Sequence, residues 1–159
     1  MPRKTTKALV REVAPDRLYN STQVAKLINR VMLNGKKQIA ERLVYGGMEK
    51  AAKKLKVDNP LEVFEQAFKN IQPHVETRSR RVGGANYQIP FEVKGQRQRH
   101  LTIMWFVAAA RARKGMSMLD RLAAELVDAY NEQGAAVKKR EDTHKMADAN
   151  RAFAHFARS

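Results

Sequence analysis

The sequence contains no cysteine, which excludes disulfide bonds, cysteine-ligated zinc and thiol catalysis. It also lacks a long apolar run: the longest, at 103–110, is only eight residues, whereas a membrane-spanning helix needs about 20. The N-terminal stretch is basic and has none of the apolar segment that a signal peptide carries. Because a cysteine-free sequence fits a reducing compartment, we expect a cytoplasmic chain that does not enter a membrane.

Acidic residues are scarce relative to basic ones. The 159 residues include 31 lysines and arginines against 16 aspartates and glutamates, which gives a net charge of +15 and a pI near 10.4. An excess of this size destabilises a compact chain through self-repulsion unless a polyanion is bound. The apolar fraction of 43% is ordinary for a folded domain with one core. The charge therefore predicts a nucleic-acid partner, with an anionic membrane surface as the alternative.

The motifs of common enzymes are absent. No G-x-S-x-G, H-E-x-x-H or H-x-E…C-x-x-C pattern occurs. Of the 4 histidines, only His144 and His155 share a predicted helix face, and eleven residues at about 1.5 Å each separate them by roughly 16 Å. That distance is too long for one metal ion. We therefore expect no enzymatic activity, no metal, no cofactor and no small-molecule substrate.

The turn Asn-Gly-Lys-Lys at 34–37 invites comparison with a phosphate-binding loop, but the match fails. That motif needs a glycine where this chain has Arg30, and serine or threonine where it has Lys37. Two interpretations remain open. The segment is either a plain turn between helices, or it places Lys36 and Lys37 at a helix N-terminus, where backbone amides and the helix dipole favour a bound phosphate.

Hydrophobic periodicity predicts a mainly α-helical, single-domain bundle of about six helices. Two helix starts are marked by capping residues: Asn59, and Ser117 with Asp120 three residues later. Residues 1–19 show no sustained period, so we expect a flexible basic arm before a helical RNA-binding domain at 20–159. The predicted helices cover about 20–32, 37–56, 60–72, 101–114, 118–130 and 135–156.

Two predictions concern the packing of these helices. In the helix at 101–114 the expected buried stripe is Leu101, Met104, Trp105 and Ala108, so Trp105 is interpreted as core rather than as a platform for stacked bases. The pair Gly46-Gly47 is expected to let its helix approach a neighbouring helix closely.

A β-hairpin is predicted at about 74–93, protruding from the bundle. Strand-favouring residues flank Gly83-Gly84, a pair that suits a tight hairpin turn. A two-stranded ribbon that is polar on both faces is not stable alone. We therefore expect this hairpin to be covered by a partner molecule.

The hairpin is rich in arginine. A turn at the glycine pair places Arg80 opposite Tyr87 and Arg78 opposite Ile89 on one face, with Arg81 on the other. Guanidinium groups beside a tyrosine suit phosphates and unstacked RNA bases. The hairpin is therefore interpreted as an arm that binds in a groove of RNA.

Two further groups of cations have open interpretations. Arg111, Arg113 and Lys114 either complement the dipole at the end of their helix or contact an anion. The run Lys138 to Arg140 lies either on a solvated helix face or against RNA. Its helix is too poor in apolar residues to lie on a membrane.

Three stretches carry a resemblance that covers essentially the whole chain: NGKK at 34–37, VETRSRRVGGANYQIPFEV at 75–93 and GAAVKKREDTHKMADANRAFAHF at 134–156. They resemble the bacterial small-subunit ribosomal protein seven family. The resemblance implies a bundle of about six helices with an extended hairpin. It also implies a primary binder of the 3-prime major domain of small-subunit ribosomal RNA. Such a protein nucleates assembly of the subunit head and lies beside the exit-site transfer RNA and the messenger RNA path.

The resemblance further implies a cytoplasmic, ribosomal location, with the head and platform ribosomal proteins nine, eleven, thirteen and nineteen as neighbours. The chain departs from the family pattern at 94–100, where a denser arginine-proline stretch is usual, and at Ala108, where glutamate is common. The residues expected to contact RNA, from the resemblance and from the hairpin, are Arg3, Lys4, Lys7, Lys36, Lys37, Arg78, Arg80, Arg81, Tyr87, Arg111, Arg113, Lys114, Lys138, Lys139 and Arg140.

Two rival classes share some of these features. A DNA-architectural protein would have the same charge, but it would prefer duplex DNA and insert apolar wedges into the minor groove. A nuclease or RNA-modifying enzyme would need clustered acids or a cofactor loop, and the sequence has neither.

Overall fold

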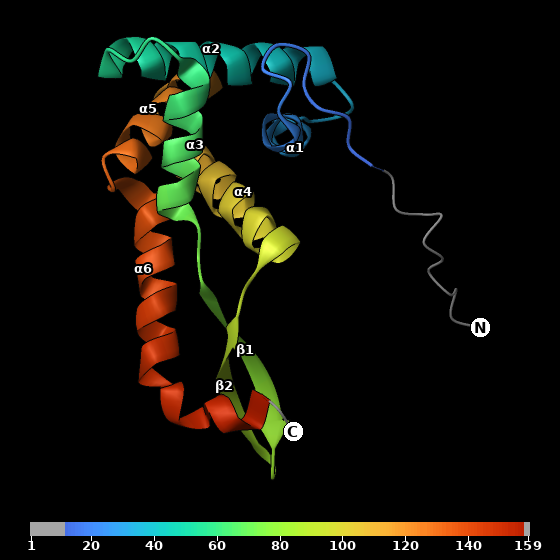
Figure 1. Ribbon diagram of the computed structural model, residues 1–159, viewed down its shortest axis with the longest axis vertical. Coiled ribbons are helices and arrows are strands. Elements are labelled where there is room, and N and C mark those ends of the chain that lie inside the picture. The colour runs from blue at the N-terminus through green and yellow to red at the C-terminus, as the bar shows by residue number, and fades with distance from the viewer. Residues whose placement is uncertain (1–11, 158–159) are drawn as a thin grey trace, which may run out of the picture.

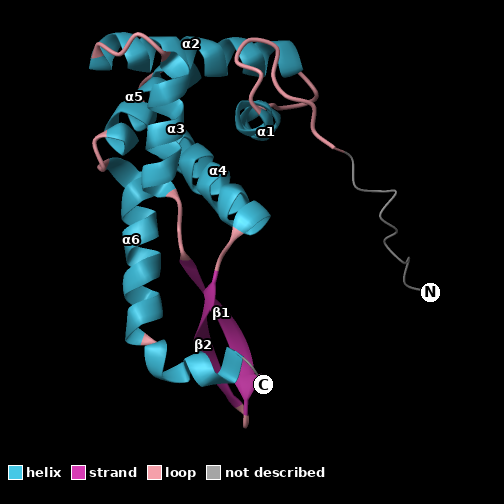
Figure 2. Cartoon of the chain, in the orientation of Figure 1, coloured by secondary structure: helices cyan, strands magenta, loops and turns pink. Residues whose placement is uncertain are grey.

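The computed structural model describes residues 12–157, which form a helical bundle with one protruding β-hairpin (Figures 1 and 2). In chain order the elements are α1 (Thr22–Val31), α2 (Lys37–Leu55), α3 (Pro60–Ile71), β1 (Val75–Val82), β2 (Ala85–Glu92), α4 (Gly95–Ala112), α5 (Met118–Tyr130), α6 (Gly134–Ala149) and the 3-10 helix η2 (Arg151–Ala157). The predicted fold class, mainly α with a β-hairpin, is confirmed. Within the described residues, no helix combines the length and apolar character needed to cross a bilayer.

Side-chain caps begin three of the helices. The Ser21 hydroxyl accepts a hydrogen bond from the backbone N–H of Val24, at the start of α1. The Asn59 side chain accepts from the backbone N–H of Leu61 at 3.0 Å, and the Ser117 hydroxyl accepts from that of Asp120 at 3.2 Å. Each cap satisfies an amide that the first helical turn leaves unpaired. The predicted caps at 59 and 117 are confirmed.

The core lies where α3 and α5 pack beneath α2 (Figure 1). Phe68 links two further rings, with centroids 4.1 Å from Phe64 and 5.2 Å from Phe106. The glycine pair in α2 allows its close approach to α5. A Cβ atom at Gly46 would lie 2.7 Å from a methyl group of Leu119, and one at Gly47 would lie within 3.2 Å of α5. The predicted packing role of these glycines is confirmed.

The buried face of α4 differs from the prediction. Trp105 packs against the core but is only partly buried, and Ala108 is exposed. The helix touches α1, α3, α5 and α6, so its buried surface is broad and not a single narrow stripe. The buried residues of α4 are Leu101, Thr102, Ile103, Phe106, Val107, Ala109 and Ala110.

The hairpin register is as predicted. Arg80 pairs with Tyr87 and Arg78 with Ile89, while Arg81 pairs with Asn86. The turn is made by Gly83 and Gly84, whose φ angles of +58° and +89° are in the left-handed region that favours glycine. The ribbon extends away from the bundle, as Figure 2 shows in magenta.

The C-terminal segment corrects two predictions. The helix expected at 135–156 ends at Ala149, and the chain then turns and runs as η2 across the hairpin (Figure 1). There the ring of Phe153 lies 5.0 Å from that of Tyr87, and Ile89 on the same strand is fully buried. The chain itself therefore covers part of the hairpin, and the prediction that only a partner could do so is wrong. The reason is the turn at Asn150, whose side chain donates to the carbonyl of Met146 and helps to end α6.

Candidate nucleic-acid interface

The N-terminal segment is anchored to the bundle at Asp16. Its carboxylate accepts hydrogen bonds from the backbone amides of Leu18, Tyr19 and Ser21 at 2.8–3.0 Å, and from the Tyr45 hydroxyl at 3.1 Å. Burial alone would raise the pKa of Asp16, but these hydrogen bonds outweigh it and the pKa is lowered. The anchor therefore fixes the segment that leads into α1. Of the predicted RNA-contacting residues, Arg3, Lys4 and Lys7 lie outside the described residues.

Asp16→Asn is expected to lower the free energy of unfolding by about 1 kcal/mol at pH 7, because hydrogen bonds to a charged group contribute more than neutral ones. The folded pKa of Asp16 lies below the usual 3.8, so its contribution is present above that value and is lost as pH falls through the lower, folded pKa. The stability difference between variant and wild type should therefore narrow below pH 3.8. Urea unfolding of both proteins at pH 7 and at successively lower pH measures this difference in the free energy of unfolding. A difference that stays constant at all pH values would contradict the anchoring role.

Lys36 and Lys37 lie at the N-terminus of α2, as predicted. Asn34 and Gly35 turn the chain with φ angles of +51° and +73°, and Lys36 is the N-cap residue. No side chain caps this helix and its first turn holds no acid, although the backbone N–H of Lys37 donates to the carbonyl of Gly35 at 2.9 Å. The positive end of the helix dipole lies at this corner. Lys37 makes a long ion pair, 3.9 Å, with Glu41 and stays exposed. This corner is well suited to a phosphate group.

Two arginines at the base of the hairpin are held by one acid. Glu76 is buried and accepts hydrogen bonds from Arg78 and from Arg97 of α4, the latter at 2.9 and 3.1 Å. Burial alone would raise the pKa of Glu76, but the hydrogen bonds and charges of Arg97 and Arg78 lower it. The Arg78 guanidinium also lies 5.2 Å from the ring centre of Phe91. Sequence reasoning missed Arg97, although Glu76 as an acid within a basic strand was a usable signal.

The tip of the hairpin carries exposed cations. Arg80 and Arg81 are both exposed and lie next to the glycine turn, far along the ribbon from the bundle. Because the register alternates, they project from opposite faces of the ribbon. The tip therefore presents positive charge on both faces.

Arg113 has a structural role that the sequence did not suggest. Its guanidinium donates to the carboxylate of Glu125 at 2.7 and 3.0 Å and also pairs with Asp128. Glu125 is fully buried, and its second oxygen accepts from the backbone N–H of Ala136 at 3.0 Å. Burial alone would lower the pKa of Arg113, but its two acidic partners raise it. Arg113 therefore ties the end of α4 to α5, and Glu125 in turn joins α5 to α6. The neighbouring Arg111 and Lys114 are exposed.

Arg140 is also turned partly inward. It donates a hydrogen bond to the backbone carbonyl of Asn70, at the end of α3. The Asn70 side chain in turn donates to the carbonyls of Ala129 and Tyr130 at 2.9 and 3.0 Å. This chain of bonds ties α6 to α3 and α5, while Lys138 and Lys139 on the same helix are exposed.

Two histidines that are distant in the sequence lie close together in the fold. His144 of α6 accepts a hydrogen bond from the backbone N–H of His74 at 3.2 Å, and the two rings lie 6.0 Å apart. Burial, the Arg140 charge and the His74 charge lower the pKa of His144. In the described part of the chain no cluster of three or more potential metal ligands occurs. The hydrogen bond between His74 and His144 has a structural role, since it fixes α6 to the base of the hairpin.

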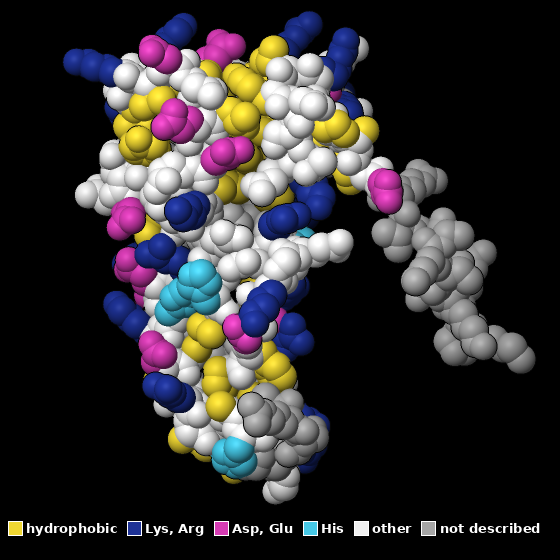
Figure 3. All heavy atoms as spheres, viewed as in Figure 1, with side chains coloured by type: hydrophobic (Ala, Val, Ile, Leu, Met, Phe, Trp, Pro, Cys, Tyr) yellow, Lys and Arg dark blue, Asp and Glu magenta, His cyan; other side chains and the backbone are white. Residues whose placement is uncertain are grey.

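The exposed cations are spread over the molecule. On the face shown in Figure 3, lysine and arginine side chains lie over α2 at the upper end and along α6 and the hairpin at the lower end. Acidic side chains are scattered among them. The predicted residues that are exposed in the structure are Lys36, Lys37, Arg78, Arg80, Arg81, Arg111, Lys114, Lys138 and Lys139.

Comparison with known proteins identifies the family. The family described as ribosomal protein S7p/S5e matches residues 2–151. A protein named small ribosomal subunit protein uS7 from Moorella thermoacetica is 58% identical over 146 residues, which is 92% of this chain and 93% of the relative. Proteins of the same name from Xanthobacter autotrophicus and Thermotoga petrophila are 55% and 54% identical over 150 residues, or 94% of this chain and 96% of each relative. The chain therefore belongs to the ribosomal protein S7p/S5e family.

Proposed function

We propose that this chain binds small-subunit ribosomal RNA directly and nucleates assembly of the head of the subunit. As a member of its family it is a structural, non-enzymatic ribosomal protein. Direct RNA binding is supported by the net charge of +15 and by exposed cations on α2, the hairpin, α4 and α6. A protein that contacts RNA at several separated points holds RNA helices in a fixed arrangement. Nucleating the assembly of an RNA domain requires such an arrangement.

The proposed RNA surface has four parts. The first is the basic N-terminal arm, within residues 1–19. The second is the start of α2, where the positive end of the helix dipole and two exposed lysines coincide. The third is the hairpin and the fourth comprises the exposed cations of α4 and α6. We leave Arg113 out of this surface because its guanidinium is bound by two carboxylates inside the protein.

The hairpin is the part proposed to reach the exit-site transfer RNA and the messenger RNA path. It extends beyond the bundle with its base fixed by Glu76 and its side covered by η2 (Figure 1). A braced arm with a charged tip places arginines at a distance from the main binding surface. Ribosomal proteins nine, eleven, thirteen and nineteen are the proposed protein neighbours.

A filter-binding comparison tests the function. The chain is expected to bind a fragment of the 3-prime major domain more tightly than duplex DNA of equal length. The logarithm of the affinity for RNA should fall linearly with the logarithm of salt concentration, by about 0.7–0.9 for each phosphate contact. A preference for duplex DNA would refute this function and favour a DNA-architectural protein, whereas a nearly flat salt response would refute binding through phosphate contacts.

A further inference from the structure

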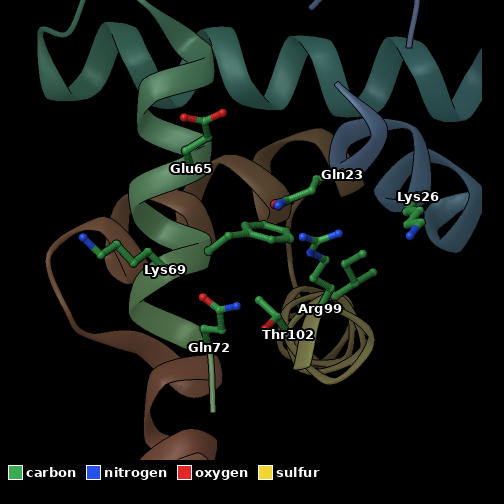
Figure 4. A pocket seen from close by; sticks show the side chains of 9 residues that line it. Gln23, Lys26, Glu65, Lys69, Gln72, Arg99 and Thr102 are labelled. Carbon is green, nitrogen blue, oxygen red and sulfur yellow. The ribbon is translucent and has the colours of Figure 1, made fainter. Parts of the chain in front are cut away.

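A half-open cavity of about 220 Å³ lies between α1, α3 and α4, apart from the surfaces described above. Figure 4 shows Gln23 from α1, Arg99 and Thr102 from α4, and Gln72 from the end of α3 around one opening. Lys26 extends outward on the far side of this opening from α3. The cavity is smaller than the roughly 300–1,000 Å³ of pockets that take drug-sized ligands. Its size therefore suits a single planar ring system.

The floor of this cavity is apolar and rigid. It contains Phe68 and Ile103, which are only 5% and 7% exposed. The Phe68 ring packs against those of Phe64 and Phe106 in the core, so only a small part of it reaches the cavity. Together with Ile103, this part forms a small apolar patch against which the face of another ring can pack.

The rim of the cavity is polar, and most of it is unused. Among the residues that the structure describes, the side chains of Gln23, Gln72, Glu65 and Arg99 make no hydrogen bond or ion pair. The Thr102 hydroxyl is occupied, since it donates to the carbonyl of Gln98 at 2.9 Å. The free groups offer amide donors and acceptors, a guanidinium and a carboxylate. Such a set matches the mixed donor and acceptor edge of a nucleobase.

A phosphate group suits this cavity less well than a base. The cations of the rim, Lys26, Lys69 and Arg99, would attract the phosphates on either side of a base. Next to Glu65, however, a phosphate would be repelled, whereas the carboxylate would accept from the amino group of a base. An apolar floor gives a phosphate nothing in return for the water that it loses. A second hollow between α1 and α4 shares Lys26 and Arg99 with the first and adds Arg30, and these cations suit the adjoining phosphates.

We propose that this cavity receives one unpaired nucleobase of the bound RNA, with its ring against Phe68 and Ile103. Its polar edge faces the side chains of the rim: Gln23, Gln72, Glu65 and Arg99. The proposal rests on the proposed function, because it names a specific contact made while ribosomal RNA is bound. RNA recognition commonly uses bases that are turned out of a helix and stacked on aromatic side chains.

Gln23→Trp tests the proposal because it fills the opening without changing the charge. The affinity for the ribosomal RNA fragment is expected to fall roughly tenfold, the size of one lost stacking contact. The slope of affinity against salt should stay as in wild type, since no phosphate contact is removed. Circular dichroism and thermal melting check that the variant is folded. A folded Gln23→Trp variant that binds as tightly as wild type overturns the proposal.

Removing single bases from the RNA locates the partner. Abasic substitution at each unpaired position of the fragment should reveal one position where wild type loses about tenfold in affinity. At that position the Gln23→Trp variant should lose nothing more, because the two changes remove the same contact. Losses that are independent at every position would show that no base enters the cavity.

Arg99→Gln gives a second test that does not depend on a bulky substitution. Its matched control is Lys54→Gln, which removes the same charge from an exposed site on α2. Arg99→Gln is expected to reduce the penalty of the critical abasic site, because it removes one of the side chains that face the base, whereas Lys54→Gln should leave the penalty unchanged. If both variants retain the full penalty, the cavity proposal fails while the proposed function stands. If wild type itself does not bind the fragment, the proposed function fails as well.

Discussion

Replacing Arg113 by alanine is expected to lower the free energy of unfolding by about 3–5 kcal/mol, because it removes one partner of a buried ion pair. Glu125 is fully buried, and without Arg113 its charge keeps only the backbone N–H of Ala136 as a hydrogen-bond donor among the described residues. Urea unfolding followed by circular dichroism measures the loss. Lys114→Ala, one residue further on and exposed, is the control and should change stability by no more than about 0.5 kcal/mol.

A double-mutant cycle tests whether the cost comes from the stranded carboxylate. Glu125→Gln removes the buried charge but keeps an oxygen that can accept from the backbone N–H of Ala136. The double variant then has no buried charge without a partner, so it should be more stable than Arg113→Ala alone. Arg113→Lys should rescue only part of the loss, since an ammonium cannot bind two carboxylates in the geometry of a guanidinium. Strict additivity of the two single variants would contradict the assignment of Arg113 as the partner of Glu125.

Local features of this fold could be predicted from the sequence. The caps at Asn59 and Ser117 act within three residues of themselves, so the pattern that predicts them is complete in the sequence. The hairpin register followed from one glycine pair, because side chains alternate strictly on either side of the turn. The exposure of Lys36 and Lys37 at the start of α2 also followed from a local turn.

Features that depend on distant packing could not be predicted. The buried face of α4 is set by four neighbouring helices, and no periodicity within the helix gives their directions. Ser117 to Tyr130 reads as an ordinary amphipathic helix, and nothing in it indicates that Glu125 would meet Arg113 from the preceding loop. The same limit applies to the candidate cavity, whose lining comes from three helices separated in the sequence.

The fold-back of the C-terminal segment onto the hairpin changes how the hairpin's function is interpreted. Treating 135–156 as one helix left the hairpin without internal cover and assigned its stability to RNA. With Phe153 against Tyr87, the ribbon has a folded support of its own. Tyr87 is partly buried and therefore has a packing role beside its proposed contact with RNA. The tip arginines carry more of the proposed binding than the tyrosine.

Replacing Arg80 and Arg81 together by alanine is expected to weaken binding to the ribosomal RNA fragment without loss of folding. Both side chains are exposed near the turn, and surface substitutions usually change stability by no more than about 0.5 kcal/mol. Each phosphate contact that is lost should reduce the slope of affinity against salt by about one unit. RNA titration at several salt concentrations, beside circular dichroism and thermal melting, measures both quantities.

The matched control for this variant is Lys53→Ala with Lys54→Ala, which removes the same charge from the exposed end of α2. If the control lowers affinity and salt slope as much as the hairpin variant does, the effect is one of net charge and the hairpin is not a specific contact. If the hairpin variant unfolds while each folded molecule binds RNA normally, the ribbon is a structural brace. Only a specific fall in affinity with unchanged melting supports the proposed arm.

Excising Arg81 to Asn86 separates the tip from the rest of the arm. The residues of β1 that contact α6, and the Glu76 network at the base, remain in place, so the bundle should fold and small subunits should still assemble. The proposed role of the tip predicts that these subunits retain exit-site transfer RNA less well and lose the reading frame more often. Both are measured on reconstituted ribosomes that carry the excised protein. If such ribosomes retain transfer RNA and maintain the reading frame normally, the tip does not contact its proposed partners. RNA binding is then confined to the base of the hairpin and the bundle.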